Sequence, residues 1–292
     1  MRKPLWVWVD TAATCNLRCA LCYTISMQST SVMDLDLFAR LVEKFRSSST
    51  RIVKFHLNWR GEPASNPRLA DMLALLDGLP WNVEWHTNGT LLHPKRAAAV
   101  VAANQGHSIY VSLDGGTAAA FERNRGAGTW HKALRGLEAL LAARGDASGP
   151  RICIYQLDLG VPPEQYDPRF RALTKRVDRY LVMSPVDADG GSLHPSGEPH
   201  TVPSGPCFWL GNALAVDVTG QAWTCLLHRG TRLGSLMDES VDDLLDRASA
   251  MRQRVQRETR AAIPGCAGCH KKEGTAHQVG DASVDGYLAG SR

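Results

Sequence analysis

Three cysteines near the amino terminus have the spacing of an iron–sulfur ligand set. Cys15, Cys19 and Cys22 lie in the stretch CNLRCALC, directly after the apolar run LWVWVD. Three thiolates can bind three irons of a four-iron cluster and leave one iron open to another ligand. The alternative is a zinc site, but zinc is usually held in a closed tetrahedron, and these cysteines have no nearby histidine to complete one. The spacing therefore favours a cluster with one open iron.

A second group of four cysteines lies in the last third of the chain. Its members are Cys207, Cys225, Cys266 and Cys269, of which the last two form a C-x-x-C unit. Four thiolates leave no open iron, so a cluster held here suits electron transfer better than direct binding of a substrate. A structural zinc ion with four thiolate ligands is the alternative. Because no cysteine follows Cys269, we expect one auxiliary cluster.

The eighth cysteine, Cys153, stands apart from both groups, in the segment RICIYQLD. A buried cysteine usually acts as a small hydrophobic residue. A thiol facing the substrate could instead return a hydrogen atom to a substrate radical, as an epimerase requires. We expect the substrate-facing positions at the strand ends, at Tyr155 and Gln156 and at Met183 and Ser184. Cys153 lies deeper than these positions, which favours oxidation over epimerisation.

The elements that would position these residues form a repeat of strands and helices. Helix-patterned segments fall between most of the β-rich runs, and in one of them Phe38, Leu41 and Phe45 share one face. Six such units predict an α/β fold, a partial TIM-like barrel of six parallel strands with its chemistry at their carboxyl ends. The β-rich runs are 5–10, 52–57, 82–86, 108–112, 151–156 and 179–183.

The composition of the chain changes after about residue 185, and the periodic pattern of apolar residues stops there. We predict a barrel over residues 1–190, a linker rich in Gly, Pro and Ser over 191–204, and a small auxiliary-cluster domain over 205–292. Within this last part, ALAVDVTGQAWTC predicts a hairpin turning at Gly220, and SVDDLLDRASAMRQRVQRE predicts a helix. The part is too small to have its own core, so we expect it to lean on the barrel.

Composition excludes several classes of function. The chain has 292 residues, a formal charge of +4 and no apolar run long enough for a signal peptide or a membrane span. Eight cysteines without secretory targeting indicate thiolate ligands in a reducing cytoplasm. The densest basic stretch has acidic neighbours and predicts a solvated helix face, with no binding of nucleic acid or membrane. Its residues are Arg252, Arg254, Arg257 and Arg260.

The order of these motifs resembles the radical SAM superfamily with a C-terminal twitch extension, a shortened SPASM domain. WRGEP resembles the family's glycine–glutamate motif, although Arg60 stands in place of its first glycine, and HTNG, VSLDG and FERNRG resemble later motifs. The resemblance implies that the open iron binds S-adenosylmethionine, whose reductive cleavage gives a 5'-deoxyadenosyl radical. It also implies a set of cofactor contacts. These are Tyr23, Gly61, Glu62, Asn88, Ser112, Asp114 and Arg125.

The overall build resembles the radical SAM dehydrogenases and epimerases of aminocyclitol and aminoglycoside antibiotic pathways, including that of spectinomycin. The resemblance implies oxidation of a secondary alcohol to a ketone, with the electron lost to the auxiliary cluster and a flavodoxin or ferredoxin as reducing partner. Candidate bases are Asp187, Asp189 and Tyr155, and Gln156 and Glu84 are further polar groups for a small substrate. The cluster motif begins at residue 15, which leaves no room before it for a leader-binding module and favours a small substrate.

Three alternatives stay open at this point. A sugar epimerase would use Cys153 as its hydrogen donor. A peptide-modifying radical enzyme would share the same two groups of cysteines. A zinc-binding adaptor would have no catalysis at all.

Overall fold

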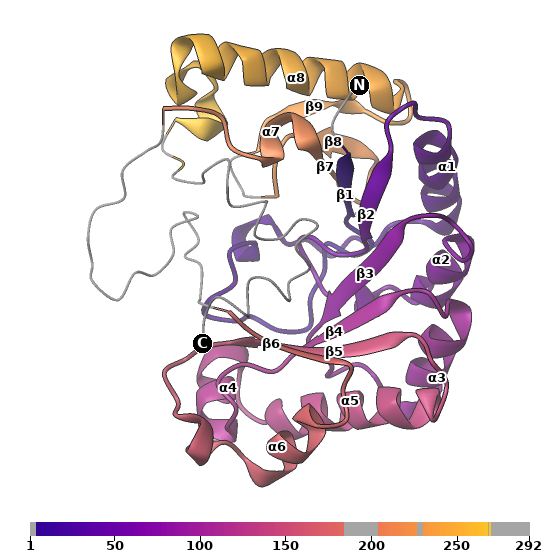
Figure 1. The fold of residues 1–292 in the computed structure, drawn as a ribbon, viewed down its shortest axis with the longest axis vertical. Helices are drawn as coiled ribbons and strands as arrows, with labels where there is room; N and C mark the ends of the chain where they lie inside the picture. Colours follow the sequence, from indigo (N-terminus) through magenta and orange to yellow (C-terminus); the bar gives the residue numbers. More distant parts are fainter. Residues whose placement is uncertain (1–3, 184–203, 227–229, 268, 270–292) are drawn as a thin grey trace.

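The computed structural model describes residues 4–183, 204–226, 230–267 and 269 (Figure 1). Ser184, Asp187, Asp189 and nearly all of the predicted linker therefore lie outside the described residues. Within them, six strands pair in parallel in chain order, and each matches its predicted run to within one residue. They are β1 Leu5–Val9, β2 Ile52–His56, β3 Asn82–Thr87, β4 Ser108–Ser112, β5 Arg151–Leu157 and β6 Arg179–Met183.

The helices that follow the strands cover the outer face of this curved sheet (Figure 1). The main core lies between the helices and the outward side chains of the strands, and it includes Val7, Phe38, Phe55, Trp85 and Leu137. Because side chains alternate along a strand, the residues between those outward positions face the inside of the barrel. The helices are α1 Leu35–Arg46, α2 Leu69–Leu75, α3 Pro94–Ala103, α4 Ala118–Arg125, α5 Trp130–Arg144 and α6 Pro168–Thr174, with short 3-10 turns at Ile25–Met27, Pro63–Ser65 and Pro163–Gln165.

The C-terminal part extends the same sheet. β7 (Ala213–Val216) pairs in parallel with β1, with Trp6 opposite Ala213. β8 (Gln221–Trp223) and β9 (Arg232–Ser235) then add antiparallel strands, which makes a sheet of nine. The predicted hairpin is confirmed, and Gly220 supplies the positive φ of +83° that its turn requires. The auxiliary part is thus hydrogen-bonded directly to the first strand of the barrel.

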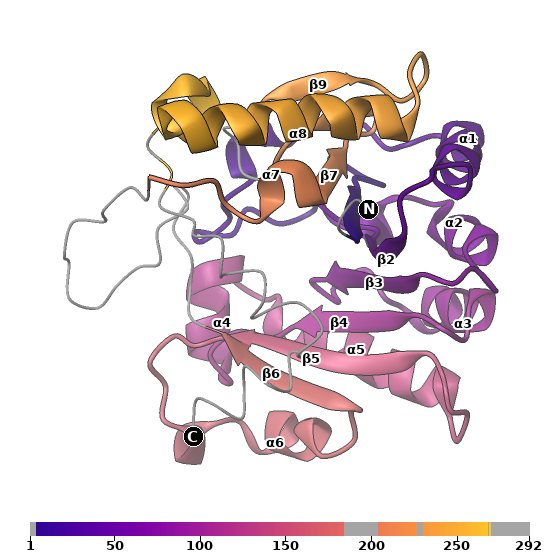
Figure 2. The same cartoon turned by 45° about the horizontal axis from the view of Figure 1, so that its top comes forward.

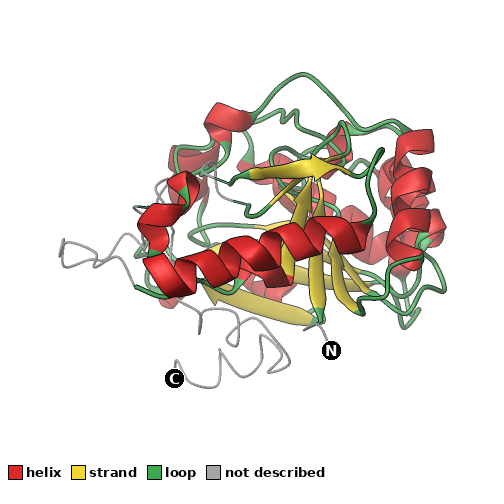
Figure 3. Cartoon of the chain, turned by 90° about the horizontal axis from the view of Figure 1, so that it is seen from above, coloured by secondary structure: helices red, strands yellow, loops and turns green. Residues whose placement is uncertain are grey.

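The predicted C-terminal helix is also confirmed, as α8 (Val241–Glu258), which lies across this end of the sheet (Figures 2 and 3). It packs on β9 and on the short α7 (Trp209–Asn212), and it is followed by two 3-10 turns, Arg260–Ala262 and Pro264–Cys266. None of the helices described here is long and apolar enough to cross a membrane.

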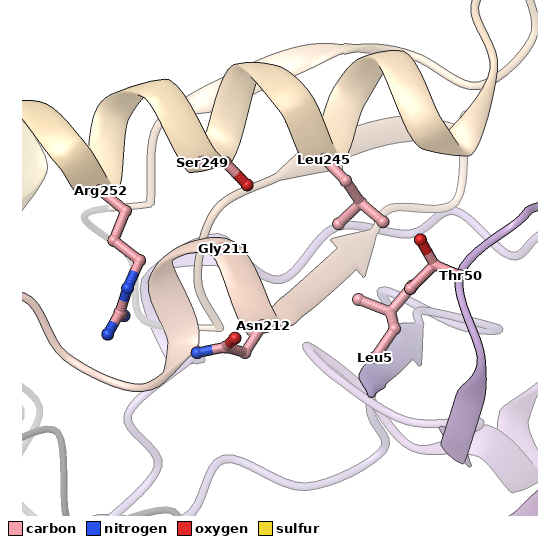
Figure 4. A pocket seen from close by; sticks show the side chains of 7 residues that line it. All are labelled: Leu5, Thr50, Gly211, Asn212, Leu245, Ser249 and Arg252. Carbon is pink, nitrogen blue, oxygen red and sulfur yellow. The ribbon is translucent and has the colours of Figure 1, made fainter. Parts of the chain in front are cut away.

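The predicted solvated basic face is wrong for two of its four arginines. Arg254 and Arg257 are exposed on α8. Arg252 points from α8 toward α7 (Figure 4), where its Nη1 donates to the carbonyls of Cys207 at 2.6 Å and Leu210 at 3.0 Å. Arg260 lies beyond the helix and is only 3% exposed. The sequence pattern missed this because both residues bind backbone carbonyls of a segment distant in the chain.

Candidate active site

Aromatic side chains and one histidine line the inside of the barrel near its carboxyl ends. His86 on β3 stacks on Tyr110 of β4, with ring centroids 4.8 Å apart, and meets Tyr155 of β5 edge-on at 5.0 Å. The imidazole makes no hydrogen bond with any described residue, and burial lowers the pKa of His86 to about 4. The imidazole is therefore uncharged at neutral pH.

Cys153 lies deeper in the same interior. It is fully buried and packs against Tyr110, Leu181 and Tyr155. Burial raises the pKa of this thiol to about 12, so it stays protonated. These neighbouring side chains cover Cys153, which is 0% exposed.

Gln156 is placed on the opposite face of β5 from Tyr155, because consecutive residues of a strand point to opposite sides. It is fully buried, and its amide donates to the Tyr166 hydroxyl at 2.8 Å and accepts from the Tyr180 hydroxyl at 2.7 Å. Gln156 thus belongs to the packing of β5 with β6 and with the segment before α6, and it does not face the barrel interior.

Glu84 faces the barrel interior but is already paired. Its carboxylate lies 2.8 Å from Lys54 Nζ and 3.1 Å from His56 Nδ1. His56 in turn stacks on Trp8, with ring centroids 4.2 Å apart. Lys54, His56 and Glu84 thus form a polar cluster, in which the Glu84 carboxylate is paired with described residues.

Gly61 brings the end of β2 against the first cysteine loop. A Cβ at this position would stand 2.3 Å from the carbonyl oxygens of both Ala12 and Thr14, closer than any real contact allows. The next amide, that of Glu62, donates to the Thr14 carbonyl at 2.9 Å. Only glycine fits this approach, so Gly61 sets how closely the cysteine loop lies to β2.

The Glu62 carboxylate joins this segment to the end of β3. It accepts from the Thr87 hydroxyl at 2.6 Å, from the Asn88 amide at 2.7 Å and from the Ala64 amide at 3.1 Å. Burial raises the pKa of Glu62, while the Asn88, Thr87 and Ala64 donors oppose that shift. The side chain positions the strand end, which leaves the backbone around Gly61 and Asn88 as the surface offered to a ligand.

Asp114 holds the next two strand ends together. Its Oδ2 accepts from Arg125 Nε at 2.6 Å and from Asn124 Nδ2 at 2.7 Å, and its Oδ1 accepts from the Leu157 amide at 3.1 Å. Ser112 is buried at the end of β4, directly opposite Tyr155 in the sheet. The predicted cofactor contacts on β4 and α4 are thus neighbours.

Asn124 anchors the cysteine loop, a role that the sequence reasoning missed. Its backbone carbonyl accepts from the Ala20 amide at 2.8 Å, and its Oδ1 accepts from the Leu21 amide at 3.0 Å. The only sequence signal was its place beside Arg125 in FERNRG. His86 was missed as well, although the strand alternation in EWHTNG could have placed it on the inner face.

The first cysteine group fits an anionic cluster. Cys15 Sγ lies 3.9 Å from Asn88 Nδ2, and Cys22 Sγ lies 3.4 Å from Thr24 Oγ1 and 3.8 Å from Gln28 Nε2, so polar groups approach both sulfurs. Burial raises the pKa of Cys15 to about 11, a cost that binding to iron removes. In the described ranges, no three His, Cys, Asp or Glu side chains gather tightly enough for one metal ion, whereas a cluster spreads its thiolates over several irons.

Tyr23 follows the third cysteine and is half-buried. Burial raises its pKa above the usual range, and the ionisable groups of Tyr155, Cys22 and Cys225 act in the same direction. The phenol therefore lies within electrostatic range of the first cysteine group, the barrel interior and the auxiliary part.

Arg60, which replaces the expected glycine, connects the barrel to the auxiliary part. Its guanidinium carbon lies 4.0 Å from the ring centroid of Trp59 and 5.5 Å from that of Trp223. It also lies 3.8 Å from carboxylate oxygens of Asp10 and Asp217. The departure from the family pattern thus contributes a contact between β2 and the β7–β8 hairpin.

Three cysteines of the second group line one small pocket together with Arg260. This auxiliary pocket contains Cys207, Cys266 and Cys269. Cys225 is not among its lining residues and acts electrostatically on Tyr23. The structure therefore gathers three of the four predicted thiolates, and Cys225 as the fourth ligand stays a prediction.

Comparison with known proteins agrees with this arrangement. Residues 9–157 match the radical SAM superfamily, and residues 207–270 match SPASM, an iron–sulfur cluster-binding domain. The chain belongs to the radical SAM superfamily, and the predicted fold is confirmed. Its cofactors are S-adenosylmethionine and 4Fe–4S clusters, as was predicted.

Its sequence relatives include the mycofactocin maturase MftC of two mycobacteria. The protein of Mycobacterium ulcerans (strain Agy99) is 30% identical over 141 residues, which are 48% of this chain and 37% of the relative. That of Mycobacterium tuberculosis (strain ATCC 25618 / H37Rv) is 28% identical over 231 residues, or 79% and 54% of the two chains. The chain thus spans about half the length of these relatives or less. Both relatives are named as maturases, and neither is named as the predicted spectinomycin-pathway dehydrogenase.

Two solved structures share the fold at low sequence identity. BtrN in complex with AdoMet and 2-DOIA is 16% identical with a TM-score of 0.59, covering 93% of this chain and 95% of its own. Native anSMEcpe with bound AdoMet is 16% identical with a TM-score of 0.64, covering 94% and 92%. The matches extend through the auxiliary part and so support the whole arrangement of barrel and C-terminal extension.

Proposed function

We propose that this radical SAM enzyme is a dehydrogenase that oxidises a secondary alcohol of an aminocyclitol or aminoglycoside intermediate to a ketone. The observation that carries the proposal is the placement of Cys153, which is fully buried beneath Tyr110 and Tyr155. A covered thiol is poorly placed to return a hydrogen atom, so the substrate radical would lose an electron. This reasoning favours oxidation over epimerisation.

When bound, S-adenosylmethionine and the first cluster supply a 5'-deoxyadenosyl radical that takes a hydrogen atom from the carbinol carbon. His86 is the described group that fits the role of base, since its neutral imidazole can take the proton of the hydroxyl. The remaining electron would pass to the auxiliary pocket. One hydrogen atom, one proton and one electron then leave the substrate, and a reduced flavodoxin or ferredoxin provides the electron that starts the reaction.

The test uses anaerobically reconstituted protein with aminocyclitols deuterated at a carbinol carbon. We expect one deuterium in 5'-deoxyadenosine for each ketone formed, and Cys153→Ala should keep this product. An isomer of the substrate carrying solvent deuterium in heavy water would show epimerisation instead. Such chemistry belongs in a reducing cytoplasm, where thiolate ligands persist.

Modification of a peptide is the second candidate. It is supported by the 28% identity to the maturase MftC over 231 residues. The discriminating experiment offers a short peptide encoded beside the gene under the same reducing conditions. Formation of 5'-deoxyadenosine that depends on the peptide, with a mass change in the peptide, would favour this candidate over the dehydrogenase.

A further inference from the structure

A buried arginine lies at the auxiliary pocket. Arg260 is 3% exposed, and it lines the pocket together with Cys207, Cys266 and Cys269. Arg260 begins a 3-10 turn directly after Thr259, the only non-glycine residue with a positive φ, +89°, in the described ranges. The backbone therefore adopts a disfavoured conformation at the point where it turns this side chain inward.

Two hydrogen bonds fix the guanidinium at this place. Arg260 Nε donates to the Gly205 carbonyl at 2.7 Å, and Nη1 donates to the Cys269 carbonyl. The two carbonyls belong to the two segments that carry the cysteines. Because arginine keeps its charge in proteins, a fixed positive charge stands beside three sulfurs.

The rest of the pocket lining is apolar. Pro206, Leu210 and Val255 line it beside the cysteines and Arg260, and Leu210 and Val255 are 2% and 1% exposed. In apolar surroundings a charge acts on its neighbours more strongly than in water. A cluster held by these thiolates would therefore lie within the field of Arg260.

We propose that Arg260 is the buried counter-charge of the auxiliary cluster and raises its reduction potential. The inference rests on the proposed function, in which the auxiliary site accepts the electron from the substrate. Taking up one electron adds one negative charge beside the guanidinium, which therefore stabilises the reduced state more than the oxidised state. Arg260 thus acts on the auxiliary cluster through its positive charge, and it need not touch the substrate.

The test is a redox titration of the full chain in which Cys15, Cys19 and Cys22 are replaced by alanine, so that only the auxiliary cluster remains. Iron per chain is counted first, and the reduced cluster is then followed by electron paramagnetic resonance. We expect Arg260→Gln to lower the ratio of reduced to oxidised cluster at a fixed potential about tenfold, which corresponds to 59 mV for a one-electron couple. Arg260→Lys, which keeps the charge, should stay close to the parent.

Arg252→Gln is the matched control. Arg252 also donates to the Cys207 carbonyl, at 2.6 Å, but it does not line the pocket, so its removal should leave the potential unchanged. Equal shifts in all three variants, or an unchanged potential in a loaded Arg260→Gln protein, would overturn the counter-charge.

Loss of the cluster is also informative. Iron lost in Arg260→Gln and retained in Arg260→Lys would support the counter-charge, whereas iron lost in both would show a purely structural role. A parent that binds about four irons through its first cysteine group and none in the triple-alanine background would instead remove the electron acceptor from the proposed function.

Discussion

At the scale of single residues, burial decides which side chains are free to act. Glu62 and Asp114 are buried carboxylates whose oxygens are taken up by neighbouring strand ends, so their chemistry is structural. His86 has the opposite character, since its side chain faces the barrel interior and its imidazole makes no hydrogen bond with a described residue. The distinction separates the groups that build the site from the group proposed to take a proton.

The burial of one histidine, His107, also makes the stability of the fold depend on pH. His107 is fully buried, and burial lowers its pKa to about 4, while the hydrogen bond with the Asn104 carbonyl acts in the opposite direction. The unfolded chain, with a histidine pKa near 6.5, binds the proton first, so stability falls as pH falls from about 6.5 toward 4. We expect His107 to contribute a loss of about 2 kcal/mol in the free energy of unfolding between pH 7 and 5.

Urea unfolding at both pH values measures this loss. His107→Gln should show a smaller decrease than the parent, and His131→Gln, at an exposed position, should show the same decrease as the parent. Identical decreases in all three proteins would contradict the assignment to His107.

At the scale of elements, loops are placed by a few close backbone contacts. The cysteine loop is fixed on one side by Gly61 and on the other by Asn124 at the end of α4. Neither contact is made by a cysteine side chain. The position of the loop is therefore set by its backbone contacts as well as by its thiolates.

Gly61→Ala should separate the loop from β2, because the added methyl group would stand 2.3 Å from two carbonyl oxygens. We expect iron per chain to fall from about eight to about four, with the auxiliary cluster retained. Gly106→Ala is the control, since its Cβ would meet nothing closer than 3.5 Å. Full iron content in Gly61→Ala would show that the loop tolerates displacement.

The sequence predicted the strands well and the inner face of the barrel less well. Apolar β-branched runs located all six strands, because the pattern of burial is local. Whether Tyr155 or Gln156 faces inward depends on which side of β5 forms the inside of the barrel. The curvature of the whole sheet decides this, and it is a tertiary property that a local sequence pattern does not show. The contact of Arg60 with Trp223 joins residues far apart in the chain, so the motif comparison could identify the departure at Arg60 but not its partner.

At the scale of the whole molecule, polar contacts tie α8 to the barrel. The Asp242 carboxylate accepts from the Ser48 hydroxyl and the Ser49 amide at 2.9 Å each and from the Thr50 hydroxyl at 3.1 Å. Lys44 Nζ donates to the Glu239 carbonyl at 2.9 Å. These contacts hold the auxiliary part against the loop after α1 in addition to the β1–β7 pairing.

Asp242→Ala should lower the free energy of unfolding by about 2 kcal/mol, because a charged acceptor of three hydrogen bonds is lost. Asp238→Ala, which removes an exposed carboxylate from the same segment, should change stability little. Denaturant titration of the protein without iron compares the two. Equal effects would mean that the contact of Asp242 with the loop after α1 contributes nothing to stability.

The pairing of β1 with β7 has a consequence for biosynthesis. During translation, β1 keeps one edge unpaired until Ala213–Val216 have been made. An open strand edge can pair with another chain, and contacts between distant parts of a chain form slowly. The nascent barrel is therefore vulnerable to aggregation until β7 has emerged, and its completion coincides with the arrival of Cys207 beside the barrel.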